Sequence, residues 1–241
     1  MKKQYKHMYY LKNQDVEIVR QAVMFINMVD KLSLNQKYIV LIGESAVDIF
    51  LYLSRICRLN YKVLLIDLSS SGIIFDIISP YGQQIEHNIF FSYGLSDKLE
   101  KQCDIVIIFT NDFSYIPKRY YSCDMYFFIS SKKYHLIRLS KSISCLKDVS
   151  NVLLVLRNSK EEKKDVIIKL HLSGIPHDVI NRTVFIKDTD NDNRVFRLME
   201  YNSVFIYKNL SEDLKRLLSY MYKKITSTSS CFDEVGFKWV M

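Results

Sequence analysis

Residues 38–69, YIVLIGESAVDIFLYLSRICRLNYKVLLIDLS, hold the pattern that decides the fold of this chain. Tyr38 to Ile42 is a short apolar run that ends at a glycine, and from Ala46 to Leu59 the apolar residues recur with helical spacing. Val63 to Ile66 is a second apolar run without polar alternation, which is typical of a strand buried on both faces of a parallel sheet. Many nucleotide-binding domains begin with this order of strand, tight turn, helix and strand.

The same alternation continues along the chain. Four further short apolar runs are expected to be strands, and two late runs are weaker candidates: 88–92, 105–109, 125–129 and 152–156, then 184–187 and 204–207. Helical patterns cover 15–29, 161–172 and 211–225, and Ser211 can cap the last of these helices. The sequence therefore predicts an α/β fold of three layers, with helices on both faces of a mostly parallel sheet.

Three segments are expected. Residues 1–37 contain an N-terminal helix packed on the domain, residues 38–226 form the α/β domain, and residues 227–241 form an aromatic C-terminal tail. The longest apolar runs fall far below the roughly 18 residues that would span a bilayer. The basic start lacks the apolar centre of a signal peptide, so we expect a cytoplasmic protein, with peripheral attachment to a membrane left open.

Cysteine and histidine usage gives no sign of a metal site. The five cysteines are odd in number and far apart, which favours reduced, packed thiols. No pair of histidines or cysteines has the spacing of metal ligands, so we expect no metal site in the protein itself.

The first turn has little of what a phosphate loop needs. Such a loop curls backbone N–H groups around the anion with the help of glycines, and it supplies a lysine and a Ser/Thr hydroxyl. Here Gly43 and Ser45 alone could take part, while Glu44 and Asp48 add negative charge. Asp67 lies 24 positions after Gly43, near where a ribose-binding acid would lie, although an aspartate at this point can also simply make a turn.

The serial order of the segments resembles the MinD/ParA family of deviant Walker-motif ATPases over about residues 38 to 225. The resemblance rests on KVLLID (62–67), CDIVIIF (103–109), DMYFFISS (124–131), VLLVLRN (152–158) and IKDTDNDNRVFRLMEYNSVFIY (186–207). It implies a P-loop-NTPase-like fold, and family members dimerise face to face across the nucleotide.

The resemblance also implies which positions would hold a nucleotide. The family's glycine-rich loop falls on Gly43 to Ala46, shortened and without its two lysines, and the Walker B aspartate falls on Phe109. Asp67 keeps the aspartate after the second strand, although the next motif position is Ser69, and Asn158 resembles the asparagine near the base unless it only makes a turn. The residual nucleotide-binding residues would be Gly43, Ser45, Asp67 and Asn158, with no catalytic residue among them.

Loss of the phosphate lysine and of the magnesium-side carboxylate removes the charge stabilisation on which phosphoryl transfer depends. The first hypothesis is therefore a pseudo-ATPase without a cofactor. It would be a scaffold or regulator that docks to a protein partner in a bacterial positioning, partition or pilus/secretion assembly. The candidate partners are a true ATPase and, in a homodimer, a second copy of this chain. The alternative is a switch or weak ATPase that still binds ATP and magnesium in an altered cleft.

A third hypothesis is a module that binds nucleic acid or an anionic membrane. The net charge of +8 would attract such partners over distance. The densest basic patch contains Lys132, Lys133, Arg138 and Lys141 on an expected helix, which could equally be an ordinary solvated helix face. The tail adds Phe237 and Trp239, which either fold back on the core or serve as a docking peptide.

Overall fold

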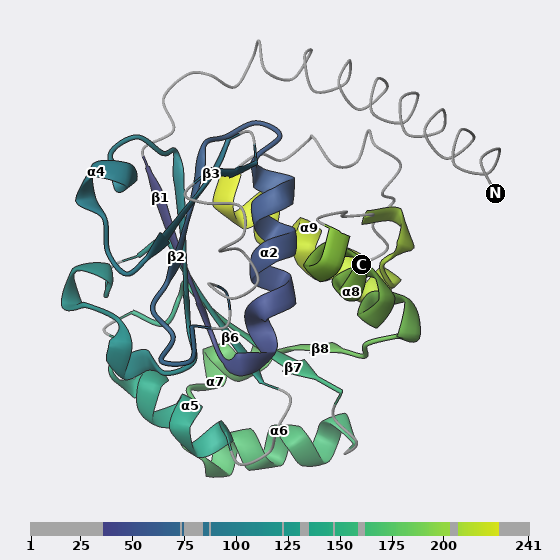
Figure 1. Cartoon of the computed structure of the whole chain (residues 1–241). Coiled ribbons are helices and arrows are strands. Elements are labelled where there is room, and N and C mark those ends of the chain that lie inside the picture. The colour runs from purple at the N-terminus through teal and green to yellow at the C-terminus, as the bar shows by residue number, and fades with distance from the viewer. Residues whose placement is uncertain are drawn as a thin grey trace, which may run out of the picture. The chain divides into compact units, whose positions relative to one another are not determined.

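The apolar runs of the sequence form one sheet in the computed structural model (Figure 1). The residues that the structure describes are 36–72, 74, 84–86, 88–121, 123–130, 135–146, 148–158, 162–202 and 207–226. Among them the strands are β1 (Lys37–Ile42), β2 (Val63–Asp67), β3 (Gln84–Glu86), β4 (Ile89–Tyr93), β5 (Ile105–Thr110), β6 (Met125–Ser130), β7 (Val152–Arg157) and β8 (Val184–Ile186).

The helices connect these strands. They are α2 (Val47–Cys57), α4 (Asp97–Glu100), α5 (His135–Ser144), α6 (Lys163–Leu172), α7 (His177–Asn181), α8 (Asp190–Asn202) and α9 (Glu212–Thr226). Short 3-10 helices lie at η1 (Glu44–Ala46), η3 (Phe113–Tyr115), η4 (Lys118–Tyr120) and η5 (Tyr207–Asn209).

The strand order in the described sheet is β3-β4-β2-β5-β1-β6-β7-β8. Only β3 runs antiparallel to its neighbour, so seven strands are parallel. The chain leaves β1 through α2 and returns in β2, and β5 then enters between these two strands. Parallel strands have all their carboxyl ends at one edge of the sheet, and this edge is where ligands of such folds bind.

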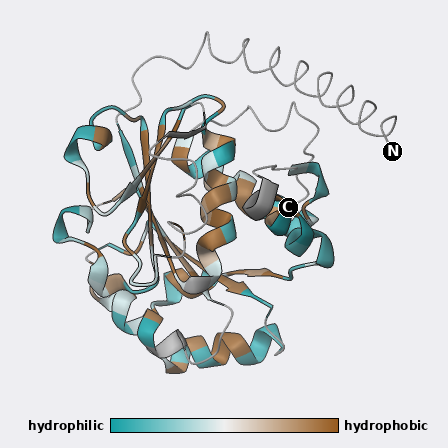
Figure 2. Ribbon diagram, in the orientation of Figure 1, coloured by the Kyte–Doolittle hydropathy of each residue, from teal (hydrophilic) through white to brown (hydrophobic). Residues whose placement is uncertain are grey.

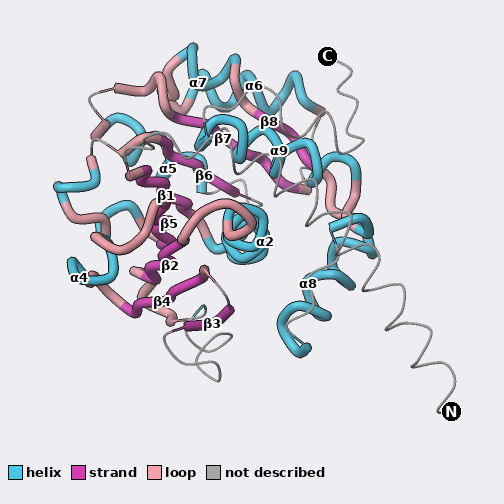
Figure 3. The backbone as a smooth tube through the Cα atoms, turned by 90° about the horizontal axis from the view of Figure 1, so that it is seen from above, coloured by secondary structure: helices cyan, strands magenta, loops and turns pink. Residues whose placement is uncertain are grey.

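Each face of the sheet is covered by helices (Figure 3). Because side chains alternate along a strand, Val40, Ile66 and Ile108 face one way, and they share a core with Leu139 of α5 and Leu170 of α6. On the other face, Phe109 of β5 meets Phe50 of α2, with the ring centroids 5.7 Å apart. Figure 2 shows the result as strands that are apolar almost throughout. The predicted three-layer fold is therefore confirmed.

Some predictions differ from the structure in detail. Tyr207 lies in the 3-10 helix η5 and not in a strand, and the rest of the predicted run at 204–207 lies outside the described residues. The sequence patterns missed α8, a helix with few apolar residues. The helix predicted within 1–37 and the tail at 227–241 also lie outside the described part.

One carboxylate, that of Asp192, binds the backbone at the N-terminal ends of both α8 and α9. Asp192 accepts hydrogen bonds from the backbone N–H and hydroxyl of Thr189, each at 2.8 Å, and it accepts another at 2.7 Å from the N–H of Ser211. The Ser211 hydroxyl accepts the N–H of Leu214 at 3.3 Å, as expected for a residue that caps α9. The predicted cap at Ser211 is confirmed.

The cysteines of the described residues are unpaired. Cys57, Cys103 and Cys123 are buried, Cys145 is exposed, and burial raises the pKa of the Cys103 thiol to about 11. A buried thiol with a raised pKa carries little thiolate and is a poor nucleophile. None of the helices in the described ranges is both long enough and apolar enough to cross a bilayer.

Candidate functional site

The turn after β1 lies at the carboxyl edge of the sheet and is only four residues long. Gly43 adopts φ +123°, and its N–H donates to the carbonyl of Thr110 on β5 at 2.9 Å. A Cβ atom at position 43 would lie 2.1 Å from the carbonyl oxygen of Ile129 on β6. The glycine is thus required because the end of β1 passes very close to β6. This contact says nothing about a phosphate, so a role of Gly43 in nucleotide binding stays a prediction.

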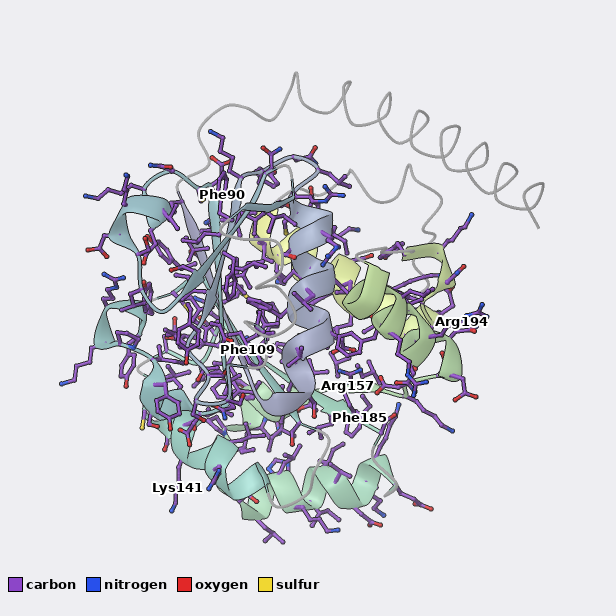
Figure 4. The ribbon with its side chains drawn as sticks, in the orientation of Figure 1. Phe90, Phe109, Lys141, Arg157, Phe185 and Arg194 are labelled. Carbon is purple, nitrogen blue, oxygen red and sulfur yellow. The ribbon has the colours of Figure 1, made fainter. Side chains whose placement is uncertain are left out.

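An arginine reaches this turn from β7. The guanidinium of Arg157 donates to both carboxylate oxygens of Asp48, at 2.6 and 2.8 Å, and to the backbone carbonyl of Ser45 at 2.5 Å. It also contacts Asp188, which follows β8, with Nη2 2.9 Å and Nε 3.2 Å from the same oxygen. We call Arg157, Asp48, Asp188 and the Ser45 carbonyl the Arg157 cluster. Figure 4 shows Arg157 beside the N-terminal end of α2.

The Arg157 cluster is nearly closed to solvent. The side chains of Arg157, Asp48 and Asp188 are 8%, 13% and 14% exposed. Burial alone would disfavour the charged guanidinium, but the two carboxylates outweigh it and raise the pKa of Arg157. Asp48 lies in the first turn of α2, where the helix dipole favours a negative charge. The chain therefore supplies its own anion at a helix N-terminus where nucleotide-binding folds hold a phosphate.

Asp67 ends β2 on the same edge but two strands away from β1, because β5 lies between them. It is 1% exposed, and its Oδ1 accepts the N–H of Ser69 at 2.8 Å. Its Oδ2 is buried and has no hydrogen-bond partner. Asp67 therefore stabilises a turn, which was the alternative to a ribose-binding role in the sequence. Its second carboxylate oxygen has no hydrogen-bond partner among the described residues.

Asn158 follows β7 with φ +53°, and its side chain is bound within the chain. Its amide Nδ2 donates to Asp188 at 2.7 Å, and its Oδ1 accepts the N–H of Asp188 at 2.8 Å. These reciprocal bonds hold the end of β7 to the residue after β8. Asn158 therefore serves as a turn asparagine beside the Arg157 cluster.

The four predicted nucleotide-binding residues thus share one edge of the sheet without forming one cluster. Gly43 and Ser45 lie at β1, Asp67 lies on one side of them and Asn158 on the other. The sequence patterns missed Arg157 and Asp188. A signal was present, because Arg157 is a charged residue that closes an otherwise apolar strand, and such a residue needs a partner when buried.

The position implied for the Walker B aspartate holds a packed ring. Phe109 is 1% exposed and lies against Phe50 of α2 (Figure 4). The next residue, Thr110, is fully buried, and its hydroxyl donates to the carbonyl of Asp112 at 2.8 Å. Within the described ranges no group of three or more His, Cys, Asp or Glu side chains could hold a metal ion.

The predicted basic surface is described in part. Arg138 and Lys141 are exposed on α5, whereas Lys132 and Lys133 lie outside the described residues, as do Phe237 and Trp239 of the tail. The helix of this surface begins at His135 in the described part of the chain.

A pocket of about 430 Å³ lies at the opposite edge, among residues that precede β5 and β6. Three of its charged groups, Asp97, Glu100 and Arg119, pair with one another. Glu100, with a side chain 8% exposed, accepts from Arg119 at 2.8 Å and from the Tyr120 hydroxyl at 2.7 Å, and Arg119 also binds Asp97 at 2.7 Å. Since the ligands of parallel sheets bind at the carboxyl ends of strands, we assign these groups a structural role.

Seven parallel strands with helices on both faces define an α/β fold of the P-loop-NTPase type. No protein-family model matches the sequence, and no curated protein matches it. Solved structures do resemble this chain, and among them are a plasmid partition protein and a ParA-family ATPase.

Three of these structures cover most of both chains. A plasmid partition protein from Borrelia burgdorferi B31, bound to AMPPNP, is 15% identical with a TM-score of 0.52 and covers 80% of this chain and 99% of its own. A ParA-family ATPase from Chlorobium tepidum is 10% identical with a TM-score of 0.52 and covers 77% and 100%. An ATP complex of McdA from Cyanothece is 12% identical with a TM-score of 0.54 and covers 86% and 98%. The chain therefore has a ParA/MinD-like fold.

Proposed function

We propose that this chain is a non-catalytic ParA/MinD-like scaffold or regulator, which docks to a protein partner in a bacterial positioning, partition or pilus/secretion assembly. The observation that carries the proposal is the Arg157 cluster, which fills the carboxyl edge at the turn after β1. This chain shares a ParA/MinD-like fold with proteins that bind adenine nucleotides. Its own residues, however, form the Arg157 cluster at the carboxyl edge.

The length of the turn supports the proposal. A phosphate loop of the G-x-x-x-x-G-K-[ST] type needs eight residues, two glycines and a lysine to surround a polyphosphate. Between β1 and α2 this chain has four residues, 43–46, and the N–H of Ala46 already bonds the Gly43 carbonyl at 3.0 Å. The residues of this turn do not fit Mg-ATP held in the ordinary way.

The charges support it as well. A triphosphate at α2 would meet the carboxylate of Asp48, and it could gain Arg157 only by breaking the bidentate pair. Repulsion between such groups at contact distance reaches several kcal/mol in a partly desolvated site, about 4 kcal/mol at 4 Å. With Phe109 where a magnesium-side carboxylate would be needed, the charge stabilisation that phosphoryl transfer requires is lacking.

The partner follows from the same reasoning. If no polyphosphate binds at the carboxyl edge, the protein would act through contacts made by its surface. We favour a protein as the binding partner of that surface. A true ATPase, a membrane-associated assembly component or a second copy of this chain would each suit a ParA/MinD-like scaffold. We place the protein in the cytoplasm, with peripheral attachment to a membrane as a further option.

The nucleotide arm of the proposal is tested by titrating the full chain with ATP, ADP and GTP in the presence of magnesium. Calorimetry and thermal unfolding should show no saturable binding and no rise in the unfolding midpoint, since a ligand at about 100 times its Kd would add about 2.7 kcal/mol of stability. Saturable binding that Asp67→Ala abolishes would overturn the non-catalytic assignment.

Docking to a protein partner is tested by capture from the native host with and without Mg-ATP. We expect the same partner to be retained in both.

The Arg157 cluster allows a sharper prediction. Arg157→Met should lower the free energy of unfolding by about 3–5 kcal/mol, because it leaves two mostly buried carboxylates without their cation. Urea unfolding measures this cost, and Arg138→Met, at an exposed arginine of α5, should change stability by less than about 0.5 kcal/mol. If Arg157→Met were as mild as the control, the cluster would not be the structural element that we infer.

A second candidate function is a switch that binds a nucleotide in an altered cleft formed by Gly43, Ser45, Asp67 and Asn158, with ATP and magnesium as its ligands. The observation that favours it is the buried Oδ2 of Asp67, because a buried carboxylate oxygen without a partner is costly unless something binds it. The same titration decides between the two functions.

A further inference from the structure

Helices α5 and α6 meet on the outside of the sheet (Figure 1). The hydroxyl of Ser140 in α5 donates to the carbonyl of Ser173, which follows α6, at 2.5 Å. This bond brings the middle of α5 to the end of α6, although the two segments lie 33 residues apart in sequence. Lys141 and Leu172 lie next to the two bonded residues and are both exposed, so the outward sides of α5 and α6 adjoin near this bond.

The α6 part of this surface is aliphatic. The helix buries Val166 and Leu170 against the sheet, so its opposite side faces outward. That outward side carries Ile168, which is 47% exposed, and Leu172, which is 82% exposed and is the most exposed large hydrophobic residue of the described chain. Residues four apart lie above one another on a helix, so these two side chains form one stripe. Figure 2 shows apolar residues on the outside of α6.

Exposed cations lie on both helices. Arg138 and Lys141 are exposed on α5, and Lys164 is exposed one turn before Ile168. Lys141 projects away from the molecule in Figure 4. Within the described residues no acid forms an ion pair with any of these three cations, and Asp165 is the single acid of α6. The surface therefore combines protruding aliphatic groups with unneutralised positive charge.

We propose that the surface formed by Arg138, Lys141, Lys164, Ile168 and Leu172 docks on an anionic lipid bilayer. Ile168 and Leu172 would enter the boundary between headgroups and acyl chains, while the three cations would remain at the level of the phosphates. A nucleic acid would satisfy the cations through its phosphates but would gain nothing from two aliphatic groups. The combination of both kinds of group therefore favours a bilayer. The proposal does not depend on whether the carboxyl edge binds a nucleotide.

The test is co-sedimentation of the full chain with vesicles. Vesicles of phosphatidylcholine and phosphatidylglycerol in equal parts should retain the wild-type protein, and vesicles of phosphatidylcholine alone should not. Removal of the aliphatic stripe by Ile168→Gln and Leu172→Gln together should weaken binding by at least about tenfold. Lys141→Gln should weaken it by about fivefold and should reduce its dependence on salt.

Two matched substitutions control for general effects. Leu59→Gln replaces an aliphatic residue of similar exposure, 44%, in the turn after α2, and Lys98→Gln replaces an exposed lysine of α4. Both should leave vesicle binding within about twofold of the wild type, because neither residue lies on the α5–α6 surface. Circular dichroism of every variant checks that the fold is intact.

Three results would overturn the proposal. The first is no retention by anionic vesicles, and the second is retention that survives loss of both aliphatic residues, which would indicate adhesion by charge alone. The third is salt-sensitive binding to duplex DNA through Lys141 without binding to vesicles, which would assign the surface to nucleic acid.

Discussion

At the scale of single residues, the carboxyl edge depends on Gly43 and Arg157. Gly43 lets β1 end against the backbone of β6, at a distance where a larger residue would collide. Arg157 then ties the turn to β7 and β8 by bonds to Asp48, Asp188 and the Ser45 carbonyl. Both residues hold together segments that are far apart in sequence: Gly43 donates to Thr110 of β5, and Arg157 binds the turn after β1.

Gly43→Ala should be among the most damaging small substitutions in the described chain. Its Cβ would lie 2.1 Å from the Ile129 carbonyl oxygen, and the backbone has φ +123°. Strain and overpacking together should lower the free energy of unfolding by about 3–5 kcal/mol. Urea unfolding measures this, with Gly94→Ala as the control, because Gly94 also has positive φ, +81°, but no atom within 4 Å of the added Cβ. Equal costs at the two sites would contradict a requirement for close approach.

At the scale of elements, α8 and α9 begin around the same carboxylate. Asp192 is 2% exposed and binds the Thr189 N–H at the start of α8 and the Ser211 N–H at the start of α9. Burial opposes its ionisation, but the hydrogen bonds outweigh burial and lower the pKa of Asp192. This helix pair is therefore stabilised by a charge that must stay ionised.

Asp192→Asn should lower the free energy of unfolding by about 2 kcal/mol at neutral pH, because an amide cannot accept on both sides. A carboxylate with a lowered folded pKa stabilises the fold above its unfolded pKa, near 3.8, and this contribution is lost as pH falls through the folded value. The difference between variant and wild type should therefore be constant from neutral pH to about pH 5 and shrink below about pH 4.

Urea unfolding across this pH range measures the difference. Asp190→Asn, at an exposed acid of the same helix turn, is the control and should cost less than about 0.5 kcal/mol at every pH. A difference for Asp192→Asn that does not change with pH would exclude the linkage.

At the scale of the whole molecule, the order of the strands decides which parts are most protected. β5 and β1 lie at the centre of the described sheet, with a parallel neighbour on each side, and every residue of β5 is buried. β8 lies at one edge and has three residues, two of them only half-buried. The sheet is thus best protected at its centre, where β1 leads into the turn at Gly43, and the Arg157 cluster ties this centre to β7 and to the residue after β8.

Hydrogen exchange should follow this order. The amides of 105–110 should exchange only through global unfolding, whereas those of 184–186 should exchange at least about tenfold faster through local opening. Mass spectrometry of peptides from the full chain measures both rates, and the amides of 39–42 serve as a second central strand for comparison. Equal protection of β8 and β5 would contradict a stability gradient set by strand order.

Much of this architecture was present in the local pattern of residues. Continuous apolar runs with helical spacing between them predicted the three-layer fold, and the predicted runs from 38–42 to 152–156 each match an observed strand to within one residue at the start. The missing lysines and the shortened turn were equally visible. By contrast, α8 was missed because its pattern is mostly polar, and its start depends on Thr189 and Asp192, whose partner Ser211 comes later in the chain.

The sequence by itself determined the fold class, because burial of apolar runs in a parallel sheet needs only the local period of the residues. It also determined that the first turn has no cation of its own. Only the tertiary structure decided that Arg157 neutralises Asp48, since 109 positions separate these two residues and the strand order alone brings them together. The same holds for the α5–α6 surface, where cations and aliphatic groups from distant segments become one face because both helices pack on the same side of the sheet.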